Sequence, residues 1–253
     1  MESYATAQQV FAAGLVFARL GAIVMLLPGF GETFIPPRIR LSFALALTLM
    51  LFPVVGRGVP AIPADAAGLA GAVIKELFIG LIIGAILRLF MSSLATAGEI
   101  VSLQTTLSFA QTANPTQAQP TATLGTFLGL IGITLIFATD LHQLFLSALV
   151  SSFELFPFSR AVPVADAGQL AIQTMSRSFA LGLQLAGPVV VFSLIFNIAT
   201  GLVGRVMPQF QVFFVATPLS VMLGLSIFAL SLGTVGMIWV DRYRDLIGTF
   251  APR

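Results

Sequence analysis

The sequence predicts an all-α, polytopic integral membrane protein with about six apolar helical segments. Its mean hydropathy is +1.01. Hydrophobic residues make up 57% of the 253-residue chain and charged residues only 9%, against roughly a quarter charged in a typical soluble domain. The apolar residues also gather in long runs separated by polar or Pro- and Gly-rich breaks, which is the pattern of helices that cross a bilayer.

The six segments follow one another at Val10–Pro28, Leu41–Gly56, Leu69–Leu94, Leu124–Phe153, Phe179–Val203 and Phe210–Val240. We treat residues 1–253 as one membrane-embedded domain. Because non-standard backbone at membrane depth survives only inside protein or beside a cavity, we expect some segments to pair as hairpins within a larger helical assembly.

Two segments fit a flat bilayer poorly. As a helix, Leu41–Gly56 is only about 24 Å long, against a hydrocarbon thickness of about 30 Å, and Pro53 interrupts its last turn. The helical pattern from Leu69 to Phe109 is longer than one crossing needs. We therefore expect that helix to leave the lipid or to bend at Gly98.

Five charged residues lie inside the apolar segments. Each costs about 2.5–3.5 kcal/mol to insert, so none should face lipid. Lys75 and Glu76 are neighbours and point about 100° apart on a helix, so they cannot pair with each other and need partners on other helices or other chains. Structural ion pairs or snorkelling side chains account for such residues, and a proton relay is the alternative. The residues are Arg19, Lys75, Glu76, Arg88 and Asp140.

Catalysis has little support in the sequence. Asp140 and His142 are two residues apart, so they should face different sides of a helix, and no nucleophile with a base is identifiable. With no Cys and one His, an ordinary metal site lacks ligands. Basic residues form no run of four or more. We therefore expect no enzyme activity, no cofactor and no nucleic-acid partner.

A polar but almost uncharged stretch, Ala97–Pro115, follows the third segment. No ionisable side chain occurs between Glu99 and Asp140, whereas a solvent loop would carry charges. Small uncharged polar groups suit a pore wall that must not hold its cargo, and apolar groups such as Leu107 and Phe109 can close a pore by dewetting. We expect a plug-like loop at about 102–123, with anchoring of Phe109 on a neighbouring helix as the alternative.

The stretch Gly187–Pro218 carries a second pattern, an apolar helix with small and polar residues followed by a Pro-containing turn. Its marked residues are Pro188, Asn197, Gly201, Arg205, Pro208, Gln209, Phe213 and Pro218. Together with Gly98, Glu99, Gln104, Leu107, Ser108, Phe109, Ala110, Asn114 and Pro115, this pattern resembles the FliR/SctT family of export-gate membrane subunits of type III secretion. The resemblance extends over essentially the whole chain and is stronger with the flagellar branch.

The resemblance implies a role for each group of residues. Those from Gln104 to Pro115 would form the pore plug, with Phe109 as the plugging aromatic, and the others would contact neighbouring subunits. Asn197 and Gln209 have an alternative role, which is to satisfy backbone groups freed around Pro208. Gly201 and Gly204 would allow close helix contacts.

The chain departs from the family pattern at two positions. Thr106 stands where the family usually has Gly, which puts a turn with positive φ in doubt because β-branched residues resist that conformation. Asn114 replaces an acidic residue before Pro115 but keeps the turn-forming chemistry of an Asn-Pro pair.

By resemblance, the chain is a subunit of the flagellar export gate in the bacterial inner membrane, at the flagellar basal body. It would form, with FliP and FliQ, the channel for unfolded flagellar proteins, with FlhB and FlhA on the cytoplasmic side and lipid around the assembly. The alternative is an autonomous secondary transporter of a small solute. That alternative predicts an internal repeat, and no convincing similarity between the two halves is visible.

Overall fold

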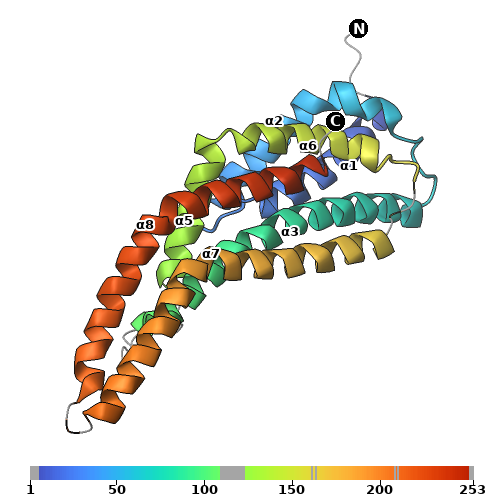
Figure 1. Cartoon of the computed structure of the whole chain (residues 1–253). Coiled ribbons are helices and arrows are strands. Elements are labelled where there is room, and N and C mark those ends of the chain that lie inside the picture. Colours follow the sequence, from blue (N-terminus) through green and yellow to red (C-terminus); the bar gives the residue numbers. More distant parts are fainter. Residues whose placement is uncertain are drawn as a thin grey trace. The chain divides into compact units, whose positions relative to one another are not determined.

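The computed structural model describes residues 6–108, 123–160, 162, 164–207, 209 and 211–250, without the side chains of Arg57 and Phe213. Within these residues the chain is all-helical (Figure 1). The helices are α1 (Ala7–Leu26), α2 (Pro37–Val55), a 3₁₀ turn η1 (Gly56–Gly58), α3 (Ala66–Gln104), α5 (Thr123–Ala138), α6 (Leu141–Leu155), α7 (Val164–Val206) and α8 (Val212–Gly248).

Local sequence explains several helix boundaries. α1 starts with a capping box, in which Thr6 Oγ1 accepts from the Gln9 backbone N–H and Gln9 Oε1 accepts from the Thr6 N–H. α2 starts with Pro37, whose fixed φ suits the first helical turn. Pro53 lies inside the last turn of α2, which ends at Val55.

The prediction of a polytopic membrane protein with about six segments is confirmed. Among the described residues, five helices are long and apolar enough to cross a membrane, namely α1, α2, α3, α7 and α8, and the pair α5 and α6 can supply a sixth span. The pair is bent by 76° at a short break. The predicted segment Leu124–Phe153 is therefore two helices, because Asp140 adopts φ 59° and interrupts the helical hydrogen bonding.

α3 is a continuous helix of 39 residues that runs through Gly98 to Gln104. α7 has 43 residues and α8 has 37, so both are longer than the apolar segments read from the sequence. Their additional turns are more polar, and helix formation there continues because no Gly-Pro or turn cluster interrupts it. Each of the three helices exceeds the about 20 residues that a simple crossing needs.

The chain divides into two compact units, each described here by itself. Unit 1 contains Met1–Phe90, Ile136–Thr174 and Arg242–Arg253. In it α1 packs against α2, and α2 also contacts α6. Its core includes Leu15, Leu20, Ile83 and Phe145, all at most 2% exposed, and the buried ring of Tyr243 stacks on Phe90 with centroids 5.0 Å apart.

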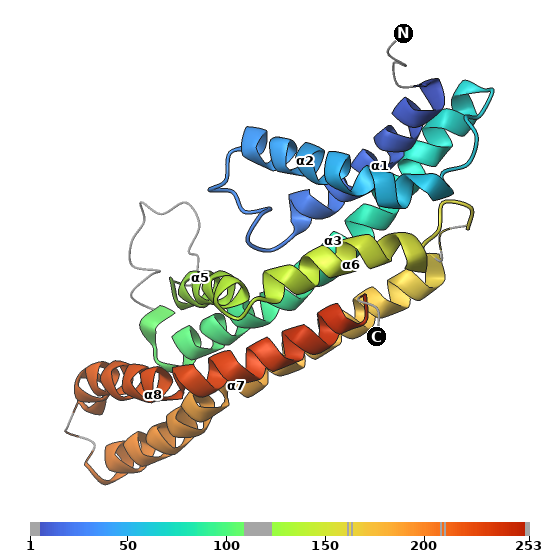
Figure 2. The same cartoon turned by 90° about the horizontal axis from the view of Figure 1, so that it is seen from above.

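Unit 2 contains Met91–Leu135 and Met175–Asp241. Its α7 and α8 portions lie side by side and are joined by the short segment 207–211 (Figures 1 and 2). Trp239 is completely buried, and its Nε1–H donates to Ser93 Oγ at 3.2 Å. This bond ties α8 to α3 within the unit.

Candidate functional site

A buried ion pair in unit 1 joins α1 to α3. Arg19 Nε donates to Glu76 Oε2 at 2.6 Å, and both residues are at most 1% exposed. Burying two charges is tolerable only when their remaining polar groups also find partners. The Arg19 guanidinium meets this condition through Ser152 O and Phe156 O, each accepting at 2.8 Å. Arg19 therefore links α1, α3 and the carboxyl end of α6.

Aromatic rings complete the surroundings of this guanidinium. Its central carbon lies 4.4 Å from the ring centroid of Phe153 and 5.2 Å from that of Phe158, within the range of cation–π attraction. Lys75 lies beside the same cluster, and its Nζ donates to Phe158 O at 2.6 Å. Two cations from α1 and α3 thus hold the segment that follows α6, at a helix end whose partial negative charge favours cations.

The other two intramembrane charges are exposed. Arg88 on α3 donates from one terminal nitrogen to Gly31 O at 3.5 Å. Asp140 lies at the bend between α5 and α6, and its side chain is 70% exposed. Arg19, Lys75, Glu76 and Arg88 therefore find partners on other parts of this chain.

Asp140 and His142 lie closer than the sequence suggested. The expectation that they face different sides of one helix is wrong, because the left-handed backbone at Asp140 ends the helical path there. His142 Nε2 lies 4.0 Å from Asp140 Oδ1. The imidazole ring also packs against the Phe137 ring, with the two centroids 5.6 Å apart. Among the described residues, no group of His, Cys, Asp and Glu side chains could hold a metal ion.

The polar end of α3 in unit 2 is the region that sequence reasoning assigned to the pore. Ser193 Oγ on α7 donates to Gln104 Oε1 at 2.7 Å, and Asn197 Nδ2 donates to Ser193 Oγ at 3.3 Å. Ser193 is 1% exposed, whereas Asn197 lies on the exposed face of α7. Gln104 and Asn197, from the two separate motifs, therefore belong to one hydrogen-bonded chain.

Thr105 and Thr106 end α3 in different ways. Thr105 is fully buried, its Oγ1 donates to Val101 O at 2.8 Å, and its side chain fills the space above Gly224 on α8. Thr106 adopts φ 59°, the left-handed conformation that often closes a helix and usually belongs to Gly. The positive-φ turn is thus kept despite the Thr, with a buried Oγ1 that has no hydrogen-bond partner in the described part of the chain.

The predicted plug lies only partly within the described residues. Leu107 and Ser108 are half-buried directly after Thr106. Phe109, Ala110, Asn114 and Pro115 fall outside the described residues, and so does Pro208 of the second motif.

The other residues of the second motif lie on α7, α8 and the turn between them. Asn197, Gly201 and Arg205 are exposed on α7, Gln209 is exposed in the turn, and Phe213 is in the first turn of α8. Pro188 and Pro218 are inside α7 and α8. A Cβ on Gly201 would meet nothing within 4 Å, so this glycine makes no close helix contact with the described residues.

Three glycines make close contacts along α3, namely Gly98, which the sequence analysis named, and Gly80 and Gly84, which it did not. A Cβ on Gly80 or Gly84 would collide with α1, and one on Gly98 would overlap the backbone of Gly125 on α5. Gly80 and Gly84 are four residues apart in an apolar helix, the Gly-x-x-x-Gly spacing of close helix packing. That spacing was visible in the sequence. Glu99, next to Gly98, points to the exposed side of α3.

The apolar spans, the bent helix pair and the charges buried between helices define a multi-pass helical membrane protein. The profile of the family described as "Bacterial export proteins, family 1" matches residues 10–246. This chain belongs to that family.

Individual relatives carry a flagellar name. The chain is 60% identical to the flagellar biosynthetic protein FliR of Caulobacter vibrioides, over 99% of this chain and 100% of that protein. It is 29% identical to FliR of Aquifex aeolicus, over 93% of this chain and 91% of the relative. With FliR of Escherichia coli it shares 28% identity over 83% of this chain and 80% of the relative.

Proposed function

We propose that this chain is a subunit of the flagellar type III export gate. With the membrane subunits FliP and FliQ it forms the channel through which unfolded flagellar proteins cross the bacterial inner membrane. FlhB and FlhA adjoin it on the cytoplasmic side of the basal body. The observation that carries this proposal is the 60% identity, along the full length of both chains, with a flagellar biosynthetic protein.

The unburied apolar surface supports a role inside an assembly. In an 18-residue apolar stretch of each of α2 and α8, only 17% of the residues are buried within the chain. α2 exposes Leu45, Leu49 and Met50, and α7 exposes Leu194 and Ile198. Lipid or neighbouring subunits must cover such faces. In an assembly, neighbouring subunits would cover several of these exposed apolar faces at once.

The polar end of α3 supports a path for unfolded chains. Gln104 and Asn197 are uncharged and at least partly exposed, so they can wet a passage without binding charged or apolar cargo strongly, while the buried Ser193 holds them in one hydrogen-bonded chain. We propose that Gln104, Leu107, Ser108, Phe109, Ala110, Asn114 and Pro115 form the gate of this passage and that Phe109 closes it. The assignment of residues beyond Ser108 rests on the sequence resemblance.

Affinity purification of the tagged chain from its native membrane in mild detergent tests the assembly. We expect FliP and FliQ to be recovered with it in fixed ratios. Recovery of the chain alone, stable and monodisperse, would contradict the proposal and would favour the autonomous transporter.

Ion leakage through the purified assembly tests the gate. Phe109→Ala should raise leakage in liposomes because the closing side chain is lost. Phe127→Ala is the matched control, since Phe127 is an aromatic residue that is 45% exposed on α5 and lies outside the plug-like loop. Equal leakage from both variants would remove Phe109 from the gate and leave the assembly proposal intact.

A further inference from the structure

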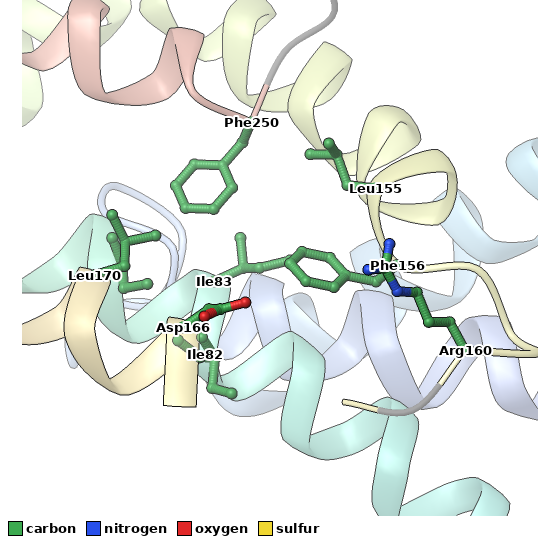
Figure 3. A pocket seen from close by; sticks show the side chains of 10 residues that line it. Ile82, Ile83, Leu155, Phe156, Arg160, Asp166, Leu170 and Phe250 are labelled. Atoms are coloured by element: carbon green, nitrogen blue, oxygen red, sulfur yellow. The ribbon is translucent and has the colours of Figure 1, made fainter. Parts of the chain in front are cut away.

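An apolar cavity of about 290 Å³ lies inside unit 1 (Figure 3). Its walls come from α3, the end of α6, the start of α7 and the residue Phe250 that follows α8. Eight of the ten lining residues are apolar, and Ile83, Leu155, Phe156, Leu170 and Phe250 are among those labelled around the space in Figure 3.

The walls of this cavity suit a hydrocarbon chain. Water needs two to four polar partners to occupy a cavity, and these walls offer mainly methyl groups and rings. At about 30 Å³ for a water-sized group, the volume holds roughly ten methylene groups. A second space of about 10 Å³, about the size of one water, shares Ile82, Ile83, Phe156 and Ala167 with it and is also lined by Ile79 and Val162, so the neighbouring wall is apolar too.

Two opposite charges lie among the lining residues. Arg160, in the segment between α6 and α7, and Asp166, in the first turn of α7, are both exposed. Within the described part of the chain they form no ion pair with each other or with another residue. A cationic and an anionic group at one apolar cavity match a ligand that has a tail and a zwitterionic head.

We propose that this cavity binds one acyl chain of a zwitterionic phospholipid. The Arg160 guanidinium binds the phosphate, which it can contact with two N–H groups, and the Asp166 carboxylate binds the headgroup ammonium. The candidate spans of the chain place it in a bilayer, where phospholipid is the surrounding medium. A partner helix fits less well, because at a diameter of about 10 Å less than one helical turn would fill the cavity.

The test measures phospholipid bound to the complex isolated from native membranes, after extensive washing in mild detergent, by mass spectrometry of the extracted lipids. Ala167→Trp should displace the acyl chain, because Ala167 lines the cavity. Ala165→Trp, two residues away and outside the lining, should keep the wild-type amount. Equal phospholipid in these two variants would overturn the proposal.

Headgroup variants test the polar contacts without changing the apolar walls. Arg160→Gln should lower phospholipid retention by at least about tenfold, as expected for the loss of the charge-assisted hydrogen bonds to the phosphate. Arg177→Gln, an exposed arginine of α7 outside the cavity, should retain the wild-type amount. Asp166→Asn should shift the bound lipid from phosphatidylethanolamine toward phosphatidylglycerol. No change in amount or headgroup in either cavity variant would overturn the assignment of the two charges.

A photoreactive residue in place of Leu170 shows whether lipid or protein occupies the cavity. Cross-linking to phospholipid supports the proposal. Cross-linking to another polypeptide in the isolated complex would replace the lipid with a partner subunit. Neither result depends on whether the complex exports flagellar proteins.

Discussion

At the scale of single residues, Arg19 connects three elements of unit 1 through its buried polar contacts. It joins a carboxylate on α3 to two carbonyls at the end of α6, and it does so at 0% exposure. A buried charge that loses its counter-charge is costly, whereas a whole buried pair can often be replaced by apolar groups at little loss. Arg19 and Glu76 should therefore respond differently to single and double substitution.

Glu76→Ala should lower the free energy of unfolding by about 3–5 kcal/mol, because it leaves the Arg19 charge buried without a carboxylate. The double variant Arg19→Met with Glu76→Leu should recover most of this loss. Thermal unfolding of the isolated complex in detergent measures both. Glu154→Ala, on the exposed side of α6, is the control, and an equal effect of Glu76→Ala and Glu154→Ala would refute the buried pair.

Thr106→Gly should raise the free energy of unfolding by up to about 1 kcal/mol, because the left-handed conformation strains a residue with a Cβ but not glycine. The neighbouring Thr105→Gly should lower it, since Thr105 is buried against Gly224 and its backbone N–H donates to Val101 O at 3.0 Å, as in a helical turn. Thermal unfolding of both variants gives the comparison. A loss of stability in both would mean that the Thr106 side chain contributes more than its backbone strain costs.

At the scale of the helices, α3 is approached closely on several sides. Gly80 and Gly84 admit α1, Gly98 meets Gly125 of α5, and Gly182 of α7 lies against Ser93 and Thr96. In a membrane, where apolar side chains gain little from leaving lipid, such close backbone contact is a main source of helix association. Substitutions at these glycines should therefore act on helix packing and not on helix formation.

Gly98→Ala should lower the free energy of unfolding by about 1–3 kcal/mol, because its Cβ would overlap the α5 backbone and push the two helices apart. Gly201→Ala on α7 is the control. It has open space around it and should be neutral or stabilising by up to about 1 kcal/mol through better helix propensity. Thermal unfolding in detergent distinguishes them. If Gly201→Ala instead impairs only assembly with partner subunits, that glycine serves an intermolecular contact.

Sequence reasoning predicted the elements well and their contacts poorly. Apolar runs of about 20 residues are a local signal, so α1 and α2 were predicted near their observed positions. The partner of Glu76 is 57 residues away in the chain, and no local pattern specifies it. The bend at Asp140 was missed because hydropathy continues across it, while the break depends on one backbone conformation.

At the scale of the whole molecule, the bent pair α5 and α6 decides how many times the chain crosses the bilayer. α5 has 16 residues and α6 has 15, so each is about 22–24 Å long and shorter than the about 30 Å hydrocarbon core. Neither helix spans the bilayer easily by itself. Together, with the bend between them, they supply enough apolar length for one broken span.

Cysteine labelling can test this arrangement directly, because the chain contains no Cys. Cysteines introduced at Thr123 and at Glu154, both exposed and at the outer ends of the bent pair, should react with a membrane-impermeant maleimide from opposite sides of the membrane. The unsubstituted chain is the unlabelled control. Labelling of both positions from the same side would identify α5 and α6 as a re-entrant pair.

The ion pair of Arg19 has a consequence for biosynthesis. Glu76 follows Arg19 by 57 residues, and the carbonyl of Ser152 follows it by 133. At about 5–20 residues per second, a ribosome needs roughly 7–27 s to synthesise the last of these partners. Until Glu76 has been made, about 3–11 s at the same rate, α1 carries an unmatched cation, and until Ser152 follows, the Arg19 guanidinium still lacks its carbonyl partners. During this time α1 must stay beside the insertion machinery or at the water interface. Stable placement of the first helix is therefore one of the later events in making this protein.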